Sequence, residues 1–185
     1  TTVLVVDAFG NTVISSTAQV DIAIGANPGG GTLSGTTSVA AVQGVAQFSD
    51  LSIDKVGAGY TLVASSSGLA AATSGSFDIA PGAPATLMIL VQPSTTGHNK
   101  PIKPPVEVGV FDAWGNLVDT ATTAITMTIA VNPSGGVLSG TTTRSAVQGI
   151  AVFDDLSIDQ NGNGYVLAAA APGLAGDQSQ PFRIK

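Results

Sequence analysis

Apolar and polar residues alternate along several short runs of the chain. The run 106–110 has valine at every second position, and the run 125–129 places Ile125, Met127 and Ile129 in the same way. Successive side chains of a β-strand point to opposite faces, so a repeat of two residues is typical of a half-buried strand, whereas a helix repeats every 3.6 residues or so. The alternation therefore predicts β-strands rather than helices.

The alternating pattern occurs twice, because the chain contains two copies of one segment. Residues 7–80 align without a gap with residues 112–185, at an offset of 105. Roughly half of the aligned positions are identical, which is the signature of a tandem repeat. One copy has the size of a small β-sandwich. The sequence thus predicts two tandem β-sandwich modules, residues 1–80 and 81–185.

Turn residues separate the alternating runs. In the first copy they fall at residues 9–11, 27–31, 43–44, 57–59 and 68, and counterparts follow in the second copy. The glycines and asparagines at these places adopt the backbone conformations that tight turns need. This spacing predicts about seven short strands in each copy, which suits a two-sheet sandwich.

The two copies differ at their beginnings. The second opens with an apolar strand pattern over residues 85–92 and a proline-rich segment over residues 93–105, whereas the first starts at Thr1 without an equivalent. We therefore expect the first module to lack its N-terminal strand and the second to be complete. An unpaired strand edge invites pairing with another strand.

This asymmetry leads to an expectation about partners. We expect the chain to be a piece of a longer array of the same module, or a subunit whose gap is filled by a strand from a neighbouring subunit. The join between the modules, residues 80–85, contains two prolines. It predicts a semi-rigid connection.

Composition and charge narrow the class of protein. The chain is 44% hydrophobic and 10% charged, with 23 glycines and no cysteine, and its net charge is −6. A β-rich protein with many turns and without disulfides has this composition. Binding to nucleic acid or to an anionic membrane needs clustered Lys and Arg and is not expected. No apolar run approaches the roughly 20 residues of a membrane-spanning helix, so no membrane insertion is expected in this fragment.

Four elements of the second copy together resemble a known family. They are residues 112–118 (Asp-Ala-Trp-Gly-Asn-Leu-Val), 136–140, 149–153 and 164–169, and the first copy shares the pattern. The combination is similar to the bacterial immunoglobulin-like repeats of the invasin and intimin type, called Big-1. The resemblance implies an all-β fold of tandem immunoglobulin-like β-sandwiches, an extracellular or bacterial cell-surface location and a role in stalks. It implies no catalytic residue and no cofactor.

Tyr60 and Tyr165 occupy matching positions in the two copies. Each follows a glycine and precedes a leucine by two positions. In immunoglobulin-like domains a tyrosine at this place forms the tyrosine corner, in which its hydroxyl bonds to the backbone a few residues upstream. The alternative is an ordinary core aromatic at the start of a strand. Both interpretations make the two tyrosines structural.

A calcium-loop pattern begins at Asp159. Together with Asn161, Asn163 and Gly164 it matches the opening of a loop in which alternate side-chain oxygens bind the ion. The twelfth position is Ala170 rather than the bidentate glutamate, and the first copy has lost two of the ligands. We therefore favour a turn and assign no metal ligand.

Two further pairs of residues invite a metal at a loop. They are Asp7 with Asn11 and Asp112 with Asn116. Aspartate and asparagine around a glycine are also ordinary turn residues. We favour turns at both places.

Acid–base catalysis has few candidates. Glu107, Asp154 and Asp155 are the acids that could form a general acid and base pair. Adjacent aspartates on a strand would point to opposite faces and could not bracket one bond. We favour a solvated strand end for Asp154 and Asp155. No nucleophile elbow or phosphate-binding loop is present. We assign no catalytic or cofactor-binding residue and expect no enzyme activity.

The single histidine lies in the proline-rich segment. His98 has Lys100 and Lys103 as neighbours in the sequence. The sharper interpretation is a contact with a small anion or a partner. We favour a mobile loop, because loops tolerate such residues freely.

Two classes of function remain after these exclusions. The first is a non-catalytic structural module that acts as a stalk, spacer or fibre-forming unit. The alternative is an adhesin-type binding module that recognises a receptor or a polysaccharide through its loops. Trp114 and its counterpart Phe9 are the aromatic residues that such a loop would offer.

Overall fold

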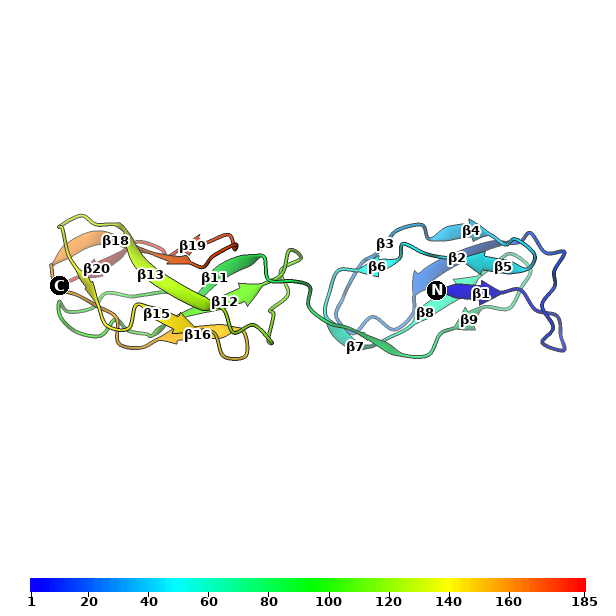
Figure 1. Cartoon of the computed structure of the whole chain (residues 1–185), viewed down its shortest axis with the longest axis horizontal. Coiled ribbons are helices and arrows are strands. Elements are labelled where there is room, and N and C mark those ends of the chain that lie inside the picture. The colour runs from blue at the N-terminus through cyan, green and yellow to red at the C-terminus, as the bar shows by residue number, and fades with distance from the viewer. The chain divides into compact units, whose positions relative to one another are not determined.

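The protein is built from β-strands and turns and contains no helix (Figure 1). The computed structural model describes all residues, Thr1–Lys185. They divide into two compact units, unit 1 with residues 1–80 and unit 2 with residues 81–185. No element is a helix of the length and hydropathy needed to cross a membrane. The predicted all-β fold is confirmed.

Unit 2 consists of two main antiparallel sheets and two small pairings. The first sheet has the order β11 (Thr86–Val91), β12 (Val106–Phe111) and β16 (Ile150–Phe153). The second has the order β15 (Thr143–Ser145), β13 (Ala124–Val131), β18 (Gly162–Ala170) and β19 (Asp177–Gln178). β20 (Phe182–Ile184) also pairs with β18, and β14 (Leu138–Ser139) pairs with β17 (Ser157–Ile158).

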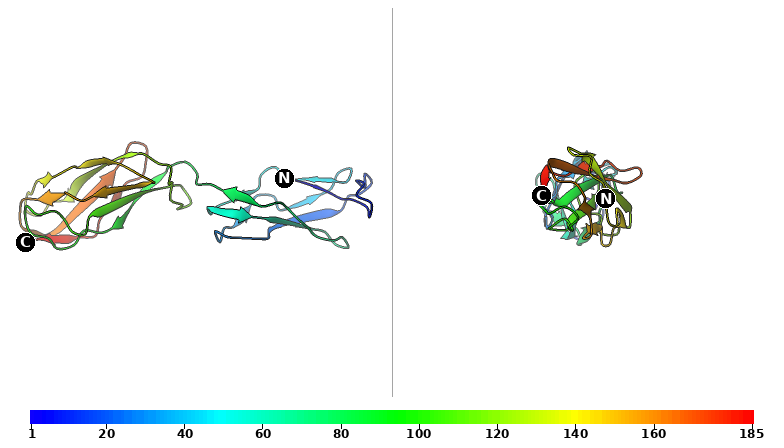
Figure 2. Two further views of the ribbon diagram at one scale, coloured as in Figure 1. Left: turned by 90° about the horizontal axis from the view of Figure 1, so that it is seen from below. Right: turned by 90° about the vertical axis from the view of Figure 1, so that its left-hand side faces the viewer.

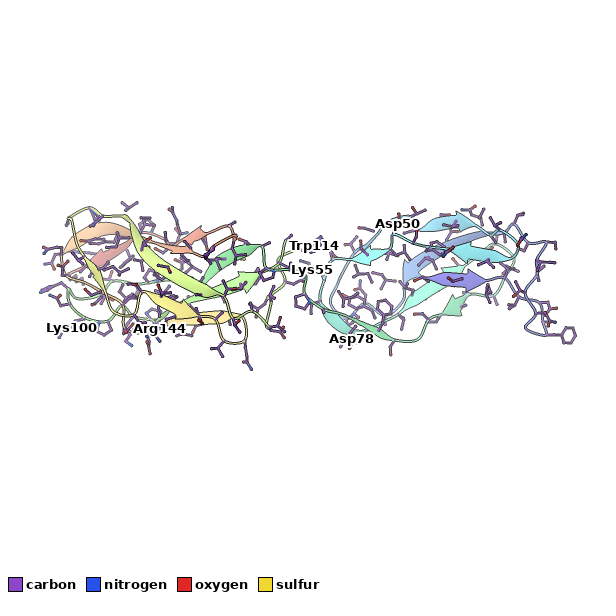
Figure 3. All side chains as sticks on the ribbon, viewed as in Figure 1. Asp50, Lys55, Asp78, Lys100, Trp114 and Arg144 are labelled. Carbon is purple, nitrogen blue, oxygen red and sulfur yellow. The ribbon has the colours of Figure 1, made fainter.

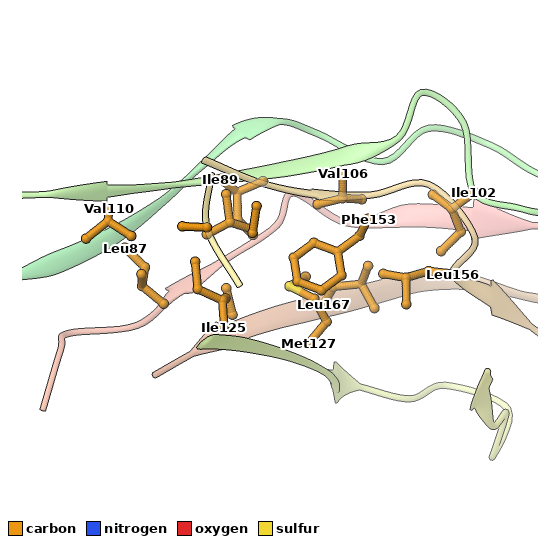
Figure 4. Close-up of a cluster of buried hydrophobic side chains, with 14 of the residues drawn as sticks. Leu87, Ile89, Ile102, Val106, Val110, Ile125, Met127, Phe153, Leu156 and Leu167 are labelled. Atoms are coloured by element: carbon orange, nitrogen blue, oxygen red, sulfur yellow. The ribbon is translucent and has the colours of Figure 1, made fainter. Parts of the chain in front are cut away.

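The core of unit 2 lies between its two sheets. Val106 and Phe153 come from the first sheet, and Ile125, Met127 and Leu167 come from the second (Figure 4). All five side chains are buried. Alternate residues of each strand enter this core because successive side chains of a strand point to opposite faces. The alternation in the sequence therefore marks the inner faces of both sheets.

Unit 1 repeats this arrangement with shorter strands (Figure 2). β1 (Thr2–Leu4) pairs with β5 (Val45–Gln47), and the second sheet has the order β4 (Ser38–Ala40), β2 (Gln19–Ile24), β8 (Leu62–Ser65) and β9 (Ala72–Thr73). β3 (Leu33–Ser34) pairs with β6 (Ser52–Ile53), and β7 (Gly57–Tyr60) pairs with β10 (Phe77–Ile79). The strand that corresponds to β12 is β1, and its only partner strand is β5.

Two of the predicted turns are strands instead. Residues 57–59 lie in β7 and residues 162–164 lie in β18. The pairing of β7 with β10 contains a register shift, and so does the pairing of β18 with β20. Gly59 in β7 and Gly164 in β18 have positive φ angles of 88° and 92°. A β-bulge accommodates a left-handed glycine without ending the strand. Breaks and bulges of this kind divide each unit into ten short strand segments rather than the seven predicted.

The tyrosine corner is confirmed in both units. The hydroxyl of Tyr60 donates to the carbonyl of Lys55 at 2.9 Å, and that of Tyr165 donates to the carbonyl of Gln160 at 3.0 Å. Both tyrosines are fully buried. Each hydroxyl thus ties its strand to the backbone five residues upstream, as in immunoglobulin-like domains. The two units are immunoglobulin-like β-sandwiches.

Candidate functional site: loop carboxylates and an open groove

Asp112 closes the loop that follows β12. Its Oδ1 accepts hydrogen bonds from the amides of Trp114 at 2.9 Å and Asn116 at 2.8 Å. Its Oδ2 accepts from the side-chain amide of Asn116 and from the backbone amide of Gly82, each at 2.9 Å. The carboxylate therefore fixes the backbone of its own loop and of the start of unit 2, as the turn interpretation expects.

These hydrogen bonds set the charge state of Asp112. Burial by itself raises the pKa of a carboxyl group, but the hydrogen bonds from Asn116, Gly82 and Trp114 outweigh it and lower the pKa of Asp112 from 3.8 to about 2. In unit 1 the same loop is exposed, and there the side-chain hydrogen bond from Asn11 lowers the pKa of Asp7. Both carboxylates are ionised at neutral pH.

Replacing Asp112 by asparagine is expected to destabilise unit 2 by about 1–2 kcal/mol at pH 6, because the ionised acceptor of four hydrogen bonds is lost. The pKa of Asp112 is depressed in the folded state, so its contribution is present above the unfolded pKa near 3.8 and is lost as the pH falls through about 2. The difference in unfolding free energy between wild type and Asp112→Asn should shrink between these values. Urea denaturation at pH 6, 4 and 2.5 measures it.

The matched control is Asp7→Asn in unit 1. Asp7 lies in an exposed loop and receives no bond that corresponds to the one from Gly82. Replacing Asp7 by asparagine is therefore expected to lower the free energy of unfolding by less than replacing Asp112 does. The difference in unfolding free energy between wild type and Asp112→Asn should depend on pH. If it does not, the result would contradict the hydrogen-bond origin of the lowered pKa of Asp112.

The calcium-loop pattern is divided between the connection from β17 to β18 and the first residues of β18. Asp159 Oδ1 accepts the amide of Val137 at 2.7 Å, and Asn163 lies within β18 opposite Arg183. Neither Asn161 nor Asn163 has a positive φ angle. The favoured turn is present over residues 159–161, which connect β17 to β18, but residues 162–164 are wrongly included in it, because strand pairing with β20 begins at Gly162. Nowhere in the chain do three or more His, Cys, Asp or Glu residues gather as a metal centre would require.

Asp154 and Asp155 face one common partner. Arg144 Nη2 lies 2.6 Å from Asp154 Oδ1 and 3.1 Å from Asp155 Oδ1. β16 ends at Phe153, so the two aspartates form the solvated strand end that the sequence favours, and the alternation within a strand does not extend to them. Glu107 lies on β12 and shares no hydrogen bond or ion pair with either aspartate.

Asp155 also closes a loop of its own. Its carboxylate accepts the amide of Thr141 at 3.1 Å and the hydroxyl of Thr141 at 2.7 Å. The side-chain bond from Thr141 is the largest influence that lowers the pKa of Asp155. The two aspartates therefore hold the β14–β15 turn and do not form an acid–base pair.

The segment around His98 is held against the C-terminal end of the chain. The amide of His98 donates to the carbonyl of Lys185 at 2.7 Å, and the ring Nδ1 lies 3.0 Å from the same oxygen. The amides of Asn99 and Ile102 donate to the carbonyls of Ile158 and Leu156. The favoured mobile loop is therefore wrong, since backbone hydrogen bonds fix the segment. Lys103 and Lys100, the latter labelled in Figure 3, are exposed beside it.

The two loop aromatics are exposed to solvent. Phe9 is 90% exposed and Trp114 is 59% exposed. Trp114 is labelled in Figure 3. Each follows the loop-closing aspartate of its unit by two residues. A single aromatic side chain per loop gives a ligand one aromatic contact surface only.

Unit 1 contains a feature that the sequence did not reveal, an apolar groove beside β1. Three hollows of about 320, 240 and 200 Å³ follow one another there: the first two share residues of β1, β8 and β9, and the last two share Thr1 and Leu62. We call them together the open groove, and its shared lining residues are Thr1, Val3, Leu4, Leu62, Ala64 and Ala72. In the sequence, the first copy lacks an equivalent of the strand that opens the second copy, and this indicated an unpaired strand edge. It did not indicate which residues line the other side of the groove.

The comparisons with known proteins return distant structural likenesses. None of the protein-family models matches the chain, and none of the curated proteins matches its sequence. A β-glycosidase from Bacteroides vulgatus is 13% identical over 90% of this chain and 21% of its own, with a TM-score of 0.45. Domains 4–9 of surface layer protein SbsC are 17% identical over 100% of this chain and 28% of their own, with a TM-score of 0.31. A tandem pair of titin immunoglobulin domains is 10% identical over 91% and 82%, with a TM-score of 0.29.

At these identities and TM-scores, the likenesses assign no activity, ligand or location to the chain. The chain spans about a fifth (21%) of the length of the glycosidase that it matches. The resemblance to Big-1 repeats stays a prediction from the sequence.

Proposed function

We propose that the chain is a non-catalytic structural module of a bacterial extracellular or cell-surface protein, in which it acts as a stalk, spacer or fibre-forming unit. The Big-1 resemblance of the two copies is part of this proposal. It rests mainly on how the polar loop side chains are used. A catalytic site brings such groups together around a pocket. Here they bond instead to the backbone of their own module.

Four candidates illustrate this use. Asp112 accepts three backbone amides, Asp155 and Asp159 each accept a backbone amide, and His98 lies against a backbone carbonyl. Each group holds a loop in place, and none converges with another on a pocket. Such a set of contacts preserves the shape of a repeated module, which is what a stalk or spacer requires.

Single-molecule force spectroscopy on the full chain, stretched between its termini, tests the structural role. A load-bearing module gives two discrete and reversible unfolding events, one for each unit. The event with the greater gain in length belongs to unit 2, which has more residues. Extension without discrete events would contradict the proposal.

The alternative is an adhesin-type binding module, and the exposure of Phe9 and Trp114 is the observation that favours it. A glycan array and a receptor pull-down with wild type, Phe9→Ala and Trp114→Ala distinguish the two functions. The structural role predicts no signal that depends on either aromatic. A signal that is lost in one of the two variants would assign binding to that loop.

A further inference from the structure

Positive charge gathers at one place in unit 2, although the chain as a whole has a net charge of −6. The chain has 6 Lys and Arg residues, and most of them lie either on the segment 98–103 or at β20. The only histidine lies on the same segment. We call these exposed residues the basic cluster, and they are His98, Lys100, Lys103, Arg183 and Lys185.

Backbone hydrogen bonds hold the two parts of the basic cluster side by side. The amide of Thr96 donates to the carbonyl of Arg183 at 3.0 Å, and the amide of Lys185 donates to the carbonyl of Thr96 at 2.8 Å. The hydroxyl oxygen of Thr96 accepts the amide of Lys103 at 3.3 Å. Thr96 thus links both stretches of backbone that carry the cations. Like charges held this close repel each other, so an anion between them would be stabilising.

The cations of the basic cluster have no carboxylate partner in the protein. No Asp or Glu forms an ion pair with them. Arg144, the remaining basic residue of unit 2, is the contrasting case, because it pairs with Asp154 and Asp155. Asp159, which precedes β18, accepts the amide of Val137. The positive charge of the basic cluster is therefore not neutralised by the chain itself.

An open hollow of about 520 Å³ lies beside two of these cations. It is lined by the first residues of β18 and by the end of the chain around β20, which pair with each other (Figure 1). Arg183 and Lys185 line it together with Asn161 and Asn163, and Asn163 lies directly opposite Arg183 in the strand pairing. No carboxylate side chain lines the hollow. It therefore offers an anion two cationic groups and two side-chain amides.

Unit 1 shows that the fold does not require these four side chains. At the offset of 105 residues their counterparts are Val56, Ala58, Asp78 and Ala80. Asp78 has the opposite charge to Arg183, and its carboxylate accepts the amide of Gly59 at 2.8 Å. The same strand pairing thus forms in unit 1 with apolar and acidic residues. The polar and basic set belongs to unit 2 alone, which favours a role in binding over a role in folding.

We propose that the hollow and the basic cluster bind an acidic polysaccharide, a glycan whose sugar rings carry carboxylate groups. Arg183 and Lys185 pair with carboxylates, because a hydrogen bond between two charged groups is stronger than a neutral one. The two asparagines bond to ring hydroxyls, since a side-chain amide both donates and accepts. Lys100 and Lys103 extend the positive surface along the neighbouring segment, so that they attract further carboxylates of the polymer.

The lining favours a sugar acid over other polyanions. It contains no aromatic side chain on which a nucleobase would stack. Its one large apolar residue, Ile184, is buried, so no side chain there would enter a membrane. Sugar hydroxyls beside a carboxylate match asparagines beside cations. The inference does not depend on the structural role proposed above, and it uses neither Phe9 nor Trp114.

The test uses the full chain and oligogalacturonate, a carboxylated oligosaccharide, with neutral dextran as the control ligand. Isothermal titration calorimetry measures the affinity, and NMR chemical-shift changes locate the site. We expect saturable binding of oligogalacturonate that shifts the amide signals of Asn163 and Arg183, and no binding of dextran. The affinity should fall at least about tenfold as NaCl rises from about 20 to about 300 mM, because salt screens exposed charges.

Two arginines provide a matched pair of variants. Arg183→Gln is expected to weaken binding about tenfold, because it removes a cation that lines the hollow. Arg144→Gln removes the same charge from an ion pair elsewhere in unit 2, and it should change the affinity less than about twofold. A double variant, Asn161→Val with Asn163→Ala, introduces the residues of unit 1 and should weaken binding about fivefold.

Four results would overturn the proposal. The first is no binding of oligogalacturonate at low salt, and the second is equal affinity of wild type and Arg183→Gln. The third is equal binding of dextran, which would exclude a role of charge. The fourth is tighter binding of heparin, DNA or phosphatidylserine vesicles, which would assign the basic cluster to another polyanion. Unchanged hydrogen exchange of β18 in each variant verifies that unit 2 stays folded, so that a loss of affinity reports the lost contact.

Discussion

Leu87→Asp is expected to unfold unit 2 and to leave unit 1 folded. Leu87 is 1% exposed and belongs to the central apolar cluster of unit 2. The substitution removes a buried leucine and puts a carboxylate into a core that offers it no hydrogen-bond donor. We expect a loss of at least about 4 kcal/mol, against the roughly 5–15 kcal/mol that stabilise a typical domain. Hydrogen exchange on the full chain measures the outcome unit by unit: the amides of β12 and β18 lose protection, and those of β2 and β8 keep it.

Met88→Asp is the matched control for this result. Met88 is the next residue of the same strand and is 45% exposed, so the same charge there stays in contact with water. Its expected cost is below about 1 kcal/mol. Equal destabilisation by the two substitutions would contradict the inward orientation of Leu87.

The second large effect is an asymmetry between equivalent leucines. Leu167→Ala is expected to cost about 3–4 kcal/mol, because Leu167 is fully buried and its removal leaves a cavity in a closed core. Leu62 is its counterpart in unit 1, is 8% exposed and lines the open groove. Leu62→Ala is expected to cost about half as much, since solvent already reaches the groove and no sealed cavity forms. Chemical denaturation, with hydrogen exchange to assign each transition to a unit, measures both.

The same pair also reports on the groove. Equal costs for both variants would mean that the core of unit 1 is as closed as that of unit 2. That result would contradict the open groove.

Several features of the fold could be predicted because they depend on short stretches of sequence. The inward face of β13 follows from the alternation of Ile125, Met127 and Ile129. The tyrosine corner depends on Tyr165 and a carbonyl five residues before it. The two-residue hairpin turn at Gln43 and Gly44, with φ angles of 51° and 77°, follows from the glycine at its second position.

The errors arose where one stretch of sequence supports more than one local structure. Gly162–Gly164 carries the residues of a turn, yet pairing with β20 makes it a bulged strand. Asp154 and Asp155 lie beyond the end of β16 as favoured, but the sequence did not reveal that Arg144, ten residues from Asp154, pairs with both. His98 has the neighbours of a mobile loop, and bonds to Lys185 hold it in place.

Periodicity and repetition were therefore enough to establish an all-β protein of two related modules, because backbone alternation and turn preferences act between residues close in sequence. The use of each loop carboxylate and the existence of the open groove required the folded structure. Asp112 meets Gly82 across thirty positions, and the groove has β1 as one wall and residues 69–74 as the other. Contacts between residues so far apart depend on how the sheets pack, and local sequence patterns carry no record of that packing.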